Sequence, residues 1–474
     1  MPGAELKPSR RLGVLIIASI AAFMGTLDGS IVNLALPSIA KALNAGLGYL
    51  ILVPTIYLIV LASLQTTFGR LADVKGRVRV FNFGVVVFTA ASLLAGLSQD
   101  ILQLIFFRVI QGAGAAIMAA TATAIVAEAY PPSKRGAAIG VNTMAVYIGL
   151  TVGPVLGGFL VQVFGWRSIF LVNLPIGGLV LLLSVYWLRG MGESSVNRSF
   201  DLGGSATLTL FLTSLLLVLS QGDLGFNTVQ TATLASVSLI SLAAFVHIER
   251  RVNEPLMDLH LFTSNRLFSA GNITALLNYS TTAGTVLLIS IHLQSILGFS
   301  PSEAGLIILT QPLVMVIAAP IAGWLSDHIE ARILSSIGML IRTLGLLMLA
   351  FYDAALSSSF IVIPLFILGL GNGMFSSPNT NSILSSVSRE RYGLASGTIG
   401  TMRTMGQSIG IALMGSIVSY AMPSGTFMHL SSDASGLTTL FVNGAKTAFL
   451  TASILSGIGV FTSLIRGKEI KRSS

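Results

Sequence analysis

The chain has 474 residues, of which 53% are hydrophobic and only 9% are charged, and its mean hydropathy is +0.85. Soluble globular proteins carry about 25% charged residues, so this composition excludes a soluble protein and indicates an integral membrane protein. Cysteine is absent and the five histidines are widely spaced, which excludes disulfides, thiol catalysis and a recognisable metal motif. The net charge of +9 could indicate a nucleic-acid partner, and whether it does depends on where the charges lie along the chain.

Apolar segments long enough to cross a bilayer follow one another along the chain. About 20 helical residues span the roughly 30 Å hydrocarbon core, and these runs do not alternate polar and apolar residues as membrane strands do. We therefore predict an all-α polytopic membrane protein with fourteen transmembrane helices. The expected segments are 12–34, 47–68, 80–97, 101–127, 136–163, 168–188, 202–220, 228–248, 267–293, 301–325, 332–351, 357–383, 395–420 and 442–465.

Lysine and arginine are distributed unevenly between the predicted loops. With the N-terminus inside, external loops hold only Lys41 and Arg167 of the 27 Lys and Arg residues, and most of the others lie in cytoplasmic segments. This positive-inside pattern predicts a multi-pass protein of the cell inner (cytoplasmic) membrane with both termini in the cytoplasm. We expect no removable signal peptide, because no small-residue cleavage site follows the first run. Topology also explains the net charge, so we expect no nucleic-acid partner.

Two halves of the chain resemble each other. GRLADVKGR at 69–77 and GWLSDHIEA at 323–331 keep Gly, Leu and Asp at the same spacing. Three glycines further along recur at a similar offset, since Gly140, Gly149 and Gly153 match Gly397, Gly406 and Gly410. Repeats of this kind place a substrate site between the halves near the middle of the membrane.

This repeat suggests how the chain is divided. We predict an N-terminal six-helix bundle at 12–188, a linker with two extra transmembrane helices at 189–266, a C-terminal six-helix bundle at 267–465 and a cytoplasmic tail at 466–474.

A stretch rich in glycine and charge, GRLADVKGRVRV at 69–80, lies in the short inner loop between the second and third segments. Its glycines permit a tight turn, and its acid and basic residues can pair with groups on neighbouring helices. Alternatively, the charges only set topology. The stretch resembles the inner-loop signature of the major facilitator superfamily. That resemblance implies a transporter fold of two helical bundles and a role in conformational gating for Gly69, Arg70, Asp73, Gly76 and Arg77.

Further stretches resemble the fourteen-span drug:proton antiporters of that superfamily. They are the early LDGSIVNLALP, RVIQGAGAA at 108–116, GLTVGPVLGG at 149–158, WRSIFLVNLPIG at 166–177, DLGG at 201–204 and EPLMDLHLF at 254–262. The resemblance extends from about residue 12 to residue 465. It implies proton-coupled exchange of a small molecule by alternating access.

The stretch at 149–158 carries a physical argument of its own. Gly149, Gly153 and Gly157 recur every four residues and share one helix face, which permits close packing against a neighbouring helix. Pro154 removes a backbone hydrogen bond and permits a bend. A tight helix contact alone would explain the pattern. The resemblance implies more, because these residues and Gly158 match the antiporter motif, whose bend seals the cavity against proton leak.

Asp28 is the one carboxylate well inside any predicted segment. Such a charge costs about 2.5–3.5 kcal/mol at the bilayer centre, so it is expected to face a cavity and to have a partner. Asp28 and Arg108 lie ~12 Å and ~10 Å inward from the outer ends of antiparallel segments, which are neighbours in the family. We predict a protonation-sensitive pair for proton coupling. A static salt bridge, or close helix approach at Gly25 and Gly29, would be an alternative reason for the motif.

Other polar residues within the segments are weaker candidates. Five of them are assigned to a substrate cavity, namely Asn33, Gln111, His292, Arg403 and Gln407. The C-terminal half has no acid at mid-membrane depth, which argues against strong selectivity for dications. No partner for Arg342 is evident from the sequence.

The predicted function is a proton-coupled efflux antiporter that exports drugs or other lipophilic compounds, works as a monomer in lipid and uses the proton gradient with no cofactor. The alternatives are a dedicated exporter of one metabolite or lipid, and a proton symporter. The sequence has no ATP-binding loop, nucleophile motif or catalytic acid pair, so we expect no enzyme activity. Sodium coupling is disfavoured because one carboxylate beside an arginine makes a poor cation site.

Overall fold

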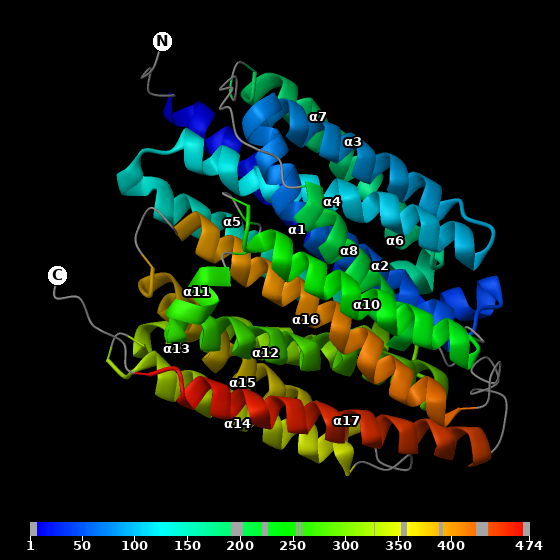
Figure 1. Ribbon diagram of the computed structural model, residues 1–474. Helices are drawn as coiled ribbons and strands as arrows, with labels where there is room; N and C mark the ends of the chain where they lie inside the picture. The colour runs from blue at the N-terminus through cyan, green and yellow to red at the C-terminus, as the bar shows by residue number, and fades with distance from the viewer. Residues whose placement is uncertain are drawn as a thin grey trace.

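The computed structural model describes residues 7–189, 191, 202–219, 226–252, 255, 257, 259–326, 328–351, 358–387, 392–422 and 435–467. In this part of the chain all regular secondary structure is helical. The long helices lie side by side, and those from the two halves of the chain form two bundles (Figure 1). The start of α1 (Pro8–Leu43) and the end of α17 (Ser435–Leu464) lie at the same end of the molecule (Figure 1).

The first bundle is built from long helices joined by short turns. Gly76 forms the turn between the second and third helices with φ +94°, a conformation that glycine adopts without strain. Asp100 caps the fourth helix, because its side chain accepts a hydrogen bond from the backbone N–H of Gln103. After α1, the helices are α2 (Leu47–Lys75), α3 (Arg77–Gly96), α4 (Ile101–Ala129), α5 (Pro132–Phe164), the short α6 (Ser168–Leu171) and α7 (Asn173–Trp187).

The middle of the chain and the second bundle continue this pattern. An Asn227–Gln230 capping box begins α10, and a Ser300–Glu303 capping box begins α13. The middle segment holds α8 (Leu202–Leu219), α10 (Thr228–Glu249) and α11 (Leu259–Ser264). The second bundle comprises α12 (Arg266–Ile291), the π-helix η1 (His292–Ile296), α13 (Pro301–Leu325), α14 (Ala331–Ala350), α15 (Ser358–Ser385), α16 (Tyr392–Ala421) and α17.

The number of membrane spans differs from the fourteen that the sequence predicts. Each expected segment falls on helix, but only 12 helices in the described residues are long and apolar enough to cross a membrane. The two helices outside this set are α8 and α16. Helix α8 is apolar but short, and α16 carries Arg403, Gln407 and several hydroxyl side chains that lower its hydropathy. The fourteen-span count is therefore not confirmed.

Glycines matched between the halves occupy matching packing positions. A Cβ atom on Gly149 of α5 would lie 2.8 Å from the Phe23 carbonyl oxygen of α1. A Cβ atom on Gly406 of α16 would lie 2.5 Å from the Leu276 carbonyl oxygen of α12. Each glycine therefore allows the fifth helix of its bundle, α5 or α16, to pack closely against the first helix, α1 or α12.

The two bundles meet at the end that the predicted topology places outside. Ser290 of α12 donates a hydrogen bond to the Asn33 carbonyl of α1 at 2.9 Å, and Gln294 of η1 donates to the Leu34 carbonyl at 3.1 Å. On the neighbouring helices, a Cβ atom on Gly305 would lie 2.4 Å from the Pro154 carbonyl oxygen. These contacts bring α1 and α5 of one bundle against α12 and α13 of the other.

Candidate functional site

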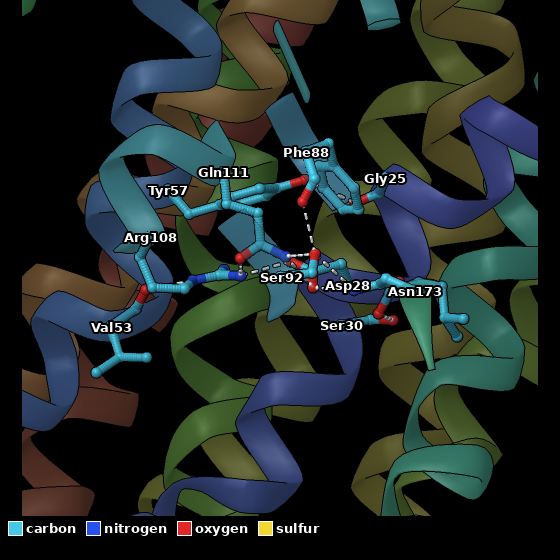
Figure 2. Close-up of polar contacts among 11 residues, drawn as sticks. Gly25, Asp28, Ser30, Val53, Tyr57, Phe88, Ser92, Arg108, Gln111 and Asn173 are labelled. Carbon is cyan, nitrogen blue, oxygen red and sulfur yellow. Dashed lines mark hydrogen bonds and ion pairs between the residues drawn. The ribbon is translucent and has the colours of Figure 1, made fainter. Parts of the chain in front are cut away.

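Asp28 of α1 and Arg108 of α4 form a fully buried ion pair (Figure 2). Both side chains are 0% exposed, and 2.5 Å separates Arg108 Nη1 from Asp28 Oδ2. The structure thus brings together two residues that are 80 positions apart in the sequence. A charge-assisted hydrogen bond of this kind is stronger than a neutral one, and its burial protects it from screening.

Two amide side chains complete the surroundings of the carboxylate. Gln111 accepts from Arg108 Nη1 at 2.7 Å and donates through Nε2 to Asp28 Oδ1 at 2.8 Å. Asn173, at the start of α7, donates through Nδ2 to the same oxygen at 2.8 Å. The Ser92 hydroxyl of α3 accepts from both amides, at 2.7 Å and 3.4 Å. The carboxylate therefore accepts from three donors, as Figure 2 shows.

The guanidinium of Arg108 is held on its other side by α2. Its Nε donates to the Val53 carbonyl at 3.1 Å, and its Cζ lies 4.1 Å from the centre of the Tyr57 ring. The Tyr57 hydroxyl donates to the Gly25 carbonyl at 2.9 Å. Cβ atoms on Gly25 and Gly29 would meet Tyr57 at 3.9 Å and 3.7 Å, which is ordinary contact. Both glycines therefore face the side chain of Tyr57. In the part of the chain that it describes, the structure does not show the close approach of two helix backbones that the sequence offered as an alternative reason for them.

Three members of this buried cluster were missed by reasoning from the sequence. Ser92, Asn173 and Tyr57 lie within predicted segments but are not charged, so they carry no signal of unusual cost. A weak signal does exist for Asn173. Asn173 lies two residues before Pro175, a residue that favours a helix start. In the structure the expected segment 168–188 is indeed broken at Val172, and Asn173 begins the new helix.

The inner-loop residues are placed at the turn between α2 and α3. Gly69 lies on α2, where, among the described residues, an added Cβ would contact Ala120 at 3.7 Å. Gly76 forms the turn itself, and Arg77 begins α3. Arg77 Nη1 pairs with Glu128 Oε2 at 3.1 Å, and both side chains are about one-third exposed. The side chains of two further motif residues, Arg70 and Asp73, lie outside the described part of the structure.

The glycine-rich stretch 149–158 on α5 contacts helices of both bundles. An added Cβ on Gly153 would overlap the Ser30 side chain, and one on Gly157 would lie 2.6 Å from Ile31 Cγ1. These two glycines and Gly149 therefore face α1, the helix that carries the buried carboxylate. On another side of α5, Gly158 packs against the Pro301 carbonyl at the start of α13.

Replacing Gly153 with valine is expected to lower the free energy of unfolding by about 1–3 kcal/mol, since overpacking a tight contact forces neighbours to move. Gly457→Val is the matched control, because a Cβ at Gly457 on α17 meets nothing within 4 Å. Thermal unfolding of the purified protein in detergent measures both. Equal unfolding temperatures for the two variants would contradict a tight α1–α5 contact.

The five cavity candidates do not gather in one place. Gln111 belongs to the Asp28 cluster, whereas the Asn33 carbonyl lies at the contact between the bundles. His292 is buried in η1, with its ring stacked on Phe441 at 6.5 Å between centres. Arg403 and Gln407, on α16, are partly exposed.

A metal site would need three or more His, Cys, Asp or Glu side chains close together. No such group occurs within the residues that the structure describes.

Taken together, two similar helical bundles, spans suited to a membrane and a buried ion pair define a membrane transporter. Models of the Major Facilitator Superfamily match residues 18–253 and 271–472. The chain therefore belongs to the major facilitator superfamily, and it is a multi-pass membrane transporter.

Relatives within the superfamily include exporters and a vitamin transporter. The chain is 37% identical over 427 residues to the multidrug resistance protein Stp of Mycobacterium tuberculosis, covering 89% of this chain and 78% of that protein. It is 34% identical over 410 residues to the riboflavin transporter RibZ of Clostridioides difficile, covering 86% and 88%. Among solved structures, an inward-facing, unoccupied bacterial homolog of the human lysosomal transporter Spinster matches with a TM-score of 0.70 at 15% identity, covering 97% and 98%.

Proposed function

We propose that the protein is a proton-coupled antiporter that exports small lipophilic molecules across the cytoplasmic membrane. The observation that carries this proposal is the buried Asp28–Arg108 pair, in which a single carboxylate accepts hydrogen bonds from three donors. A protonated carboxyl needs an acceptor for its own hydrogen, but the groups around Asp28 offer donors. The arrangement therefore suits the ionised form of Asp28.

Protonation of Asp28 would break its bond to Arg108, and this supplies the coupling. Among the described residues, Arg108 Nη2 already has no hydrogen-bond partner. Loss of the carboxylate's charge would leave this buried guanidinium without its counter-ion, which is costly, and only Gln111 would then accept from Nη1. We infer that α1 and α4 then shift relative to each other. Because α1 packs on α5, and α5 contacts α13, such a shift reaches the contact between the bundles.

The same proposal covers topology and gating. We place both termini in the cytoplasm, assign α8 and α16 as additional spans and assign the protein a monomeric state in lipid. The inner loop around Gly76 then lies on the cytoplasmic side, where it would control opening. The relatives support transport of more than one class of compound, since one is a multidrug resistance protein and another is a riboflavin transporter. The alternative function is a dedicated exporter of one metabolite or lipid, and the riboflavin transporter is a relative whose name gives a single compound.

For the inner loop, Arg77→Gln is expected to change the free energy of unfolding by no more than about 1 kcal/mol, because ion pairs that are one-third exposed to solvent contribute little. If the pair helps to set the inward–outward balance, transport should nevertheless slow several-fold. Initial transport rates and thermal unfolding are measured on the same preparation. An unchanged rate would remove the gating role from this side chain.

A proton-flux assay in proteoliposomes tests the proposed function. A pH-sensitive dye is trapped inside vesicles at equal internal and external pH, and lipophilic cations, neutral drugs and lipophilic carboxylates are added outside. Exchange predicts that the lumen becomes more alkaline as substrate enters and protons leave. A symporter would make the lumen more acidic. No response to any compound in the panel would contradict multidrug export and favour a dedicated exporter.

A further inference from the structure

The second bundle contains two arginines at span positions and no acid to balance them. Arg342 lies on α14 and is 0% exposed, and Arg403 lies on α16 and is partly exposed. The sequence of the helices α12–α17 holds no Asp or Glu away from the helix ends. In the described part of the chain, neither guanidinium is within ion-pair distance of a carboxylate.

The guanidinium of Arg342 is incompletely satisfied. Its Nε donates to the Thr281 hydroxyl of α12 at 2.9 Å. Its two terminal nitrogens, Nη1 and Nη2, have no hydrogen-bond partner among the described residues. A buried, unpaired charge is expensive, and an arginine that served only packing would be replaceable by an apolar residue. The two free nitrogens are the pair that would bind both oxygens of a carboxylate.

The repeat places Thr281 where the first bundle has its carboxylate. Gly149 of α5 packs against Leu27, one residue before Asp28 on α1. The matched Gly406 of α16 packs against the backbone of Ser280, one residue before Thr281. In the first bundle an internal carboxylate therefore faces an arginine, whereas in the second a hydroxyl faces one. The second bundle lacks the anion that the first supplies from its own chain.

This cationic region lies next to the boundary between the bundles. Tyr279 of α12 lies two residues before Thr281, the partner of Arg342. A Cβ atom on Gly406, three residues after Arg403 on α16, would lie 3.1 Å from the Tyr279 Cβ atom. The Tyr279 hydroxyl lies 3.5 Å from the Ser376 hydroxyl of α15, which is 3.4 Å from the Tyr147 hydroxyl of α5. Tyr147 belongs to the first bundle and the other residues to the second. A molecule held between the bundles would therefore lie beside Tyr279, on the helix that also carries Thr281, the partner of Arg342.

We propose that Arg342, Arg403, Thr281 and Tyr279 form a binding site for an anionic group, such as a carboxylate, on the transported molecule. This inference rests on the proposed function, because it names a chemical class for the substrate of that transporter. Arg403, which is partly exposed, attracts the anion first. Arg342 then binds it when α12 and α14 separate enough to admit it. The oxygens of the anion complete the hydrogen bonding of Arg342.

Binding of a matched pair of probes tests the site. Dansylglycine carries a carboxylate, and its amide carries none but has the same aromatic group. Fluorescence titration of purified protein in lipid nanodiscs is expected to show at least ten-fold tighter binding of the acid. Arg342→Met should lose this preference, and Arg342→Lys should keep part of it. Thr281→Asp should also lose it, because the new carboxylate neutralises Arg342 from within.

Controls separate this site from general effects. Arg332→Met alters another arginine on α14, which pairs with Glu330 at 3.1 Å, and should keep the preference. Competition by chloride added to a low-salt buffer without carboxylate anions, against the acid but not the amide, would show that the site also takes inorganic anions. Absence of such competition would show selectivity for the carboxylate. Competition by chloride thus distinguishes a site for any small anion from a site that is selective for the carboxylate of the transported molecule.

Two results would overturn the proposal. One is equal affinity for acid and amide, or no binding of the acid, in the wild-type protein. The other is a preference that survives in Arg342→Met. Because the titration needs no transport, a failure of proton coupling leaves its result standing, and the proposed function and this site can fail independently.

Discussion

Replacing Asp28 with asparagine is expected to abolish uphill export and to lower the free energy of unfolding, because the guanidinium of Arg108 stays buried without its anion. A potential of 100 mV is worth ~2.3 kcal/mol for each charge moved, which sustains a substrate gradient of roughly fifty-fold. Asparagine keeps the shape of the side chain and can still accept hydrogen bonds from Gln111 and Asn173, but it cannot carry a proton. The gradient built by wild-type vesicles should therefore fall to about one, a loss measured as accumulated substrate at steady state.

Asp100→Asn is the matched control for this variant. Asp100 is also a carboxylate of the first bundle, but it is exposed and only caps α4. Asp100→Asn should lower the free energy of unfolding by at most about 1 kcal/mol, as for other helix caps, and leave substrate accumulation unchanged. Uphill transport that persists in Asp28→Asn would show that the pair with Arg108 is a static salt bridge.

Replacing Arg108 with methionine is expected to lower the free energy of unfolding by about 3–5 kcal/mol, because it leaves the carboxylate of Asp28 buried without its cation. The double variant Asp28→Asn, Arg108→Met should recover much of this stability, since it removes both charges. It should remain inactive in proton-driven transport. Recovery of stability without recovery of transport separates a structural role from a coupling role.

Thermal unfolding in detergent, with expression level as a second measure, tests this pattern of loss and recovery. Equal unfolding temperatures for wild type and Arg108→Met would show that Asp28 is not ionised in the folded protein. A double variant no more stable than Arg108→Met would show that the loss comes from packing around Tyr57 and Val53, which contact the guanidinium.

The helices and the Asp28–Arg108 contact could be predicted because their signals are strong and local. Apolar runs of about 20 residues separated by charged loops mark helices directly, and all the expected segments fall on helix. A lone carboxylate in an apolar helix needs a partner, and Arg108 was selected by its depth along an antiparallel helix that neighbours the first helix in the family the sequence resembles. Both inferences rest on the cost of placing charge in lipid.

Neutral polar partners could not be predicted in the same way. Asn173, Ser92 and Tyr57 carry no charge, and whether they face the carboxylate or lipid depends on helix rotation, which the sequence leaves open. Gln111 was assigned to a substrate cavity because it lies one turn from Arg108, yet its amide spans from Arg108 to Asp28. The surroundings of Arg342 needed the structure for the same reason, because its hydrogen-bond partner in the described part of the chain is a hydroxyl on another helix.

The most direct test of the central claim is an infrared difference spectrum of the purified protein between acidic and neutral pH. If Asp28 is the proton-binding group, acidification should produce the C=O band of a buried protonated carboxyl. That band should shift when aspartate is labelled with carbon-13, disappear in Asp28→Asn and persist in Asp100→Asn. A band that is unchanged in Asp28→Asn would contradict the assignment of Asp28 as the proton carrier.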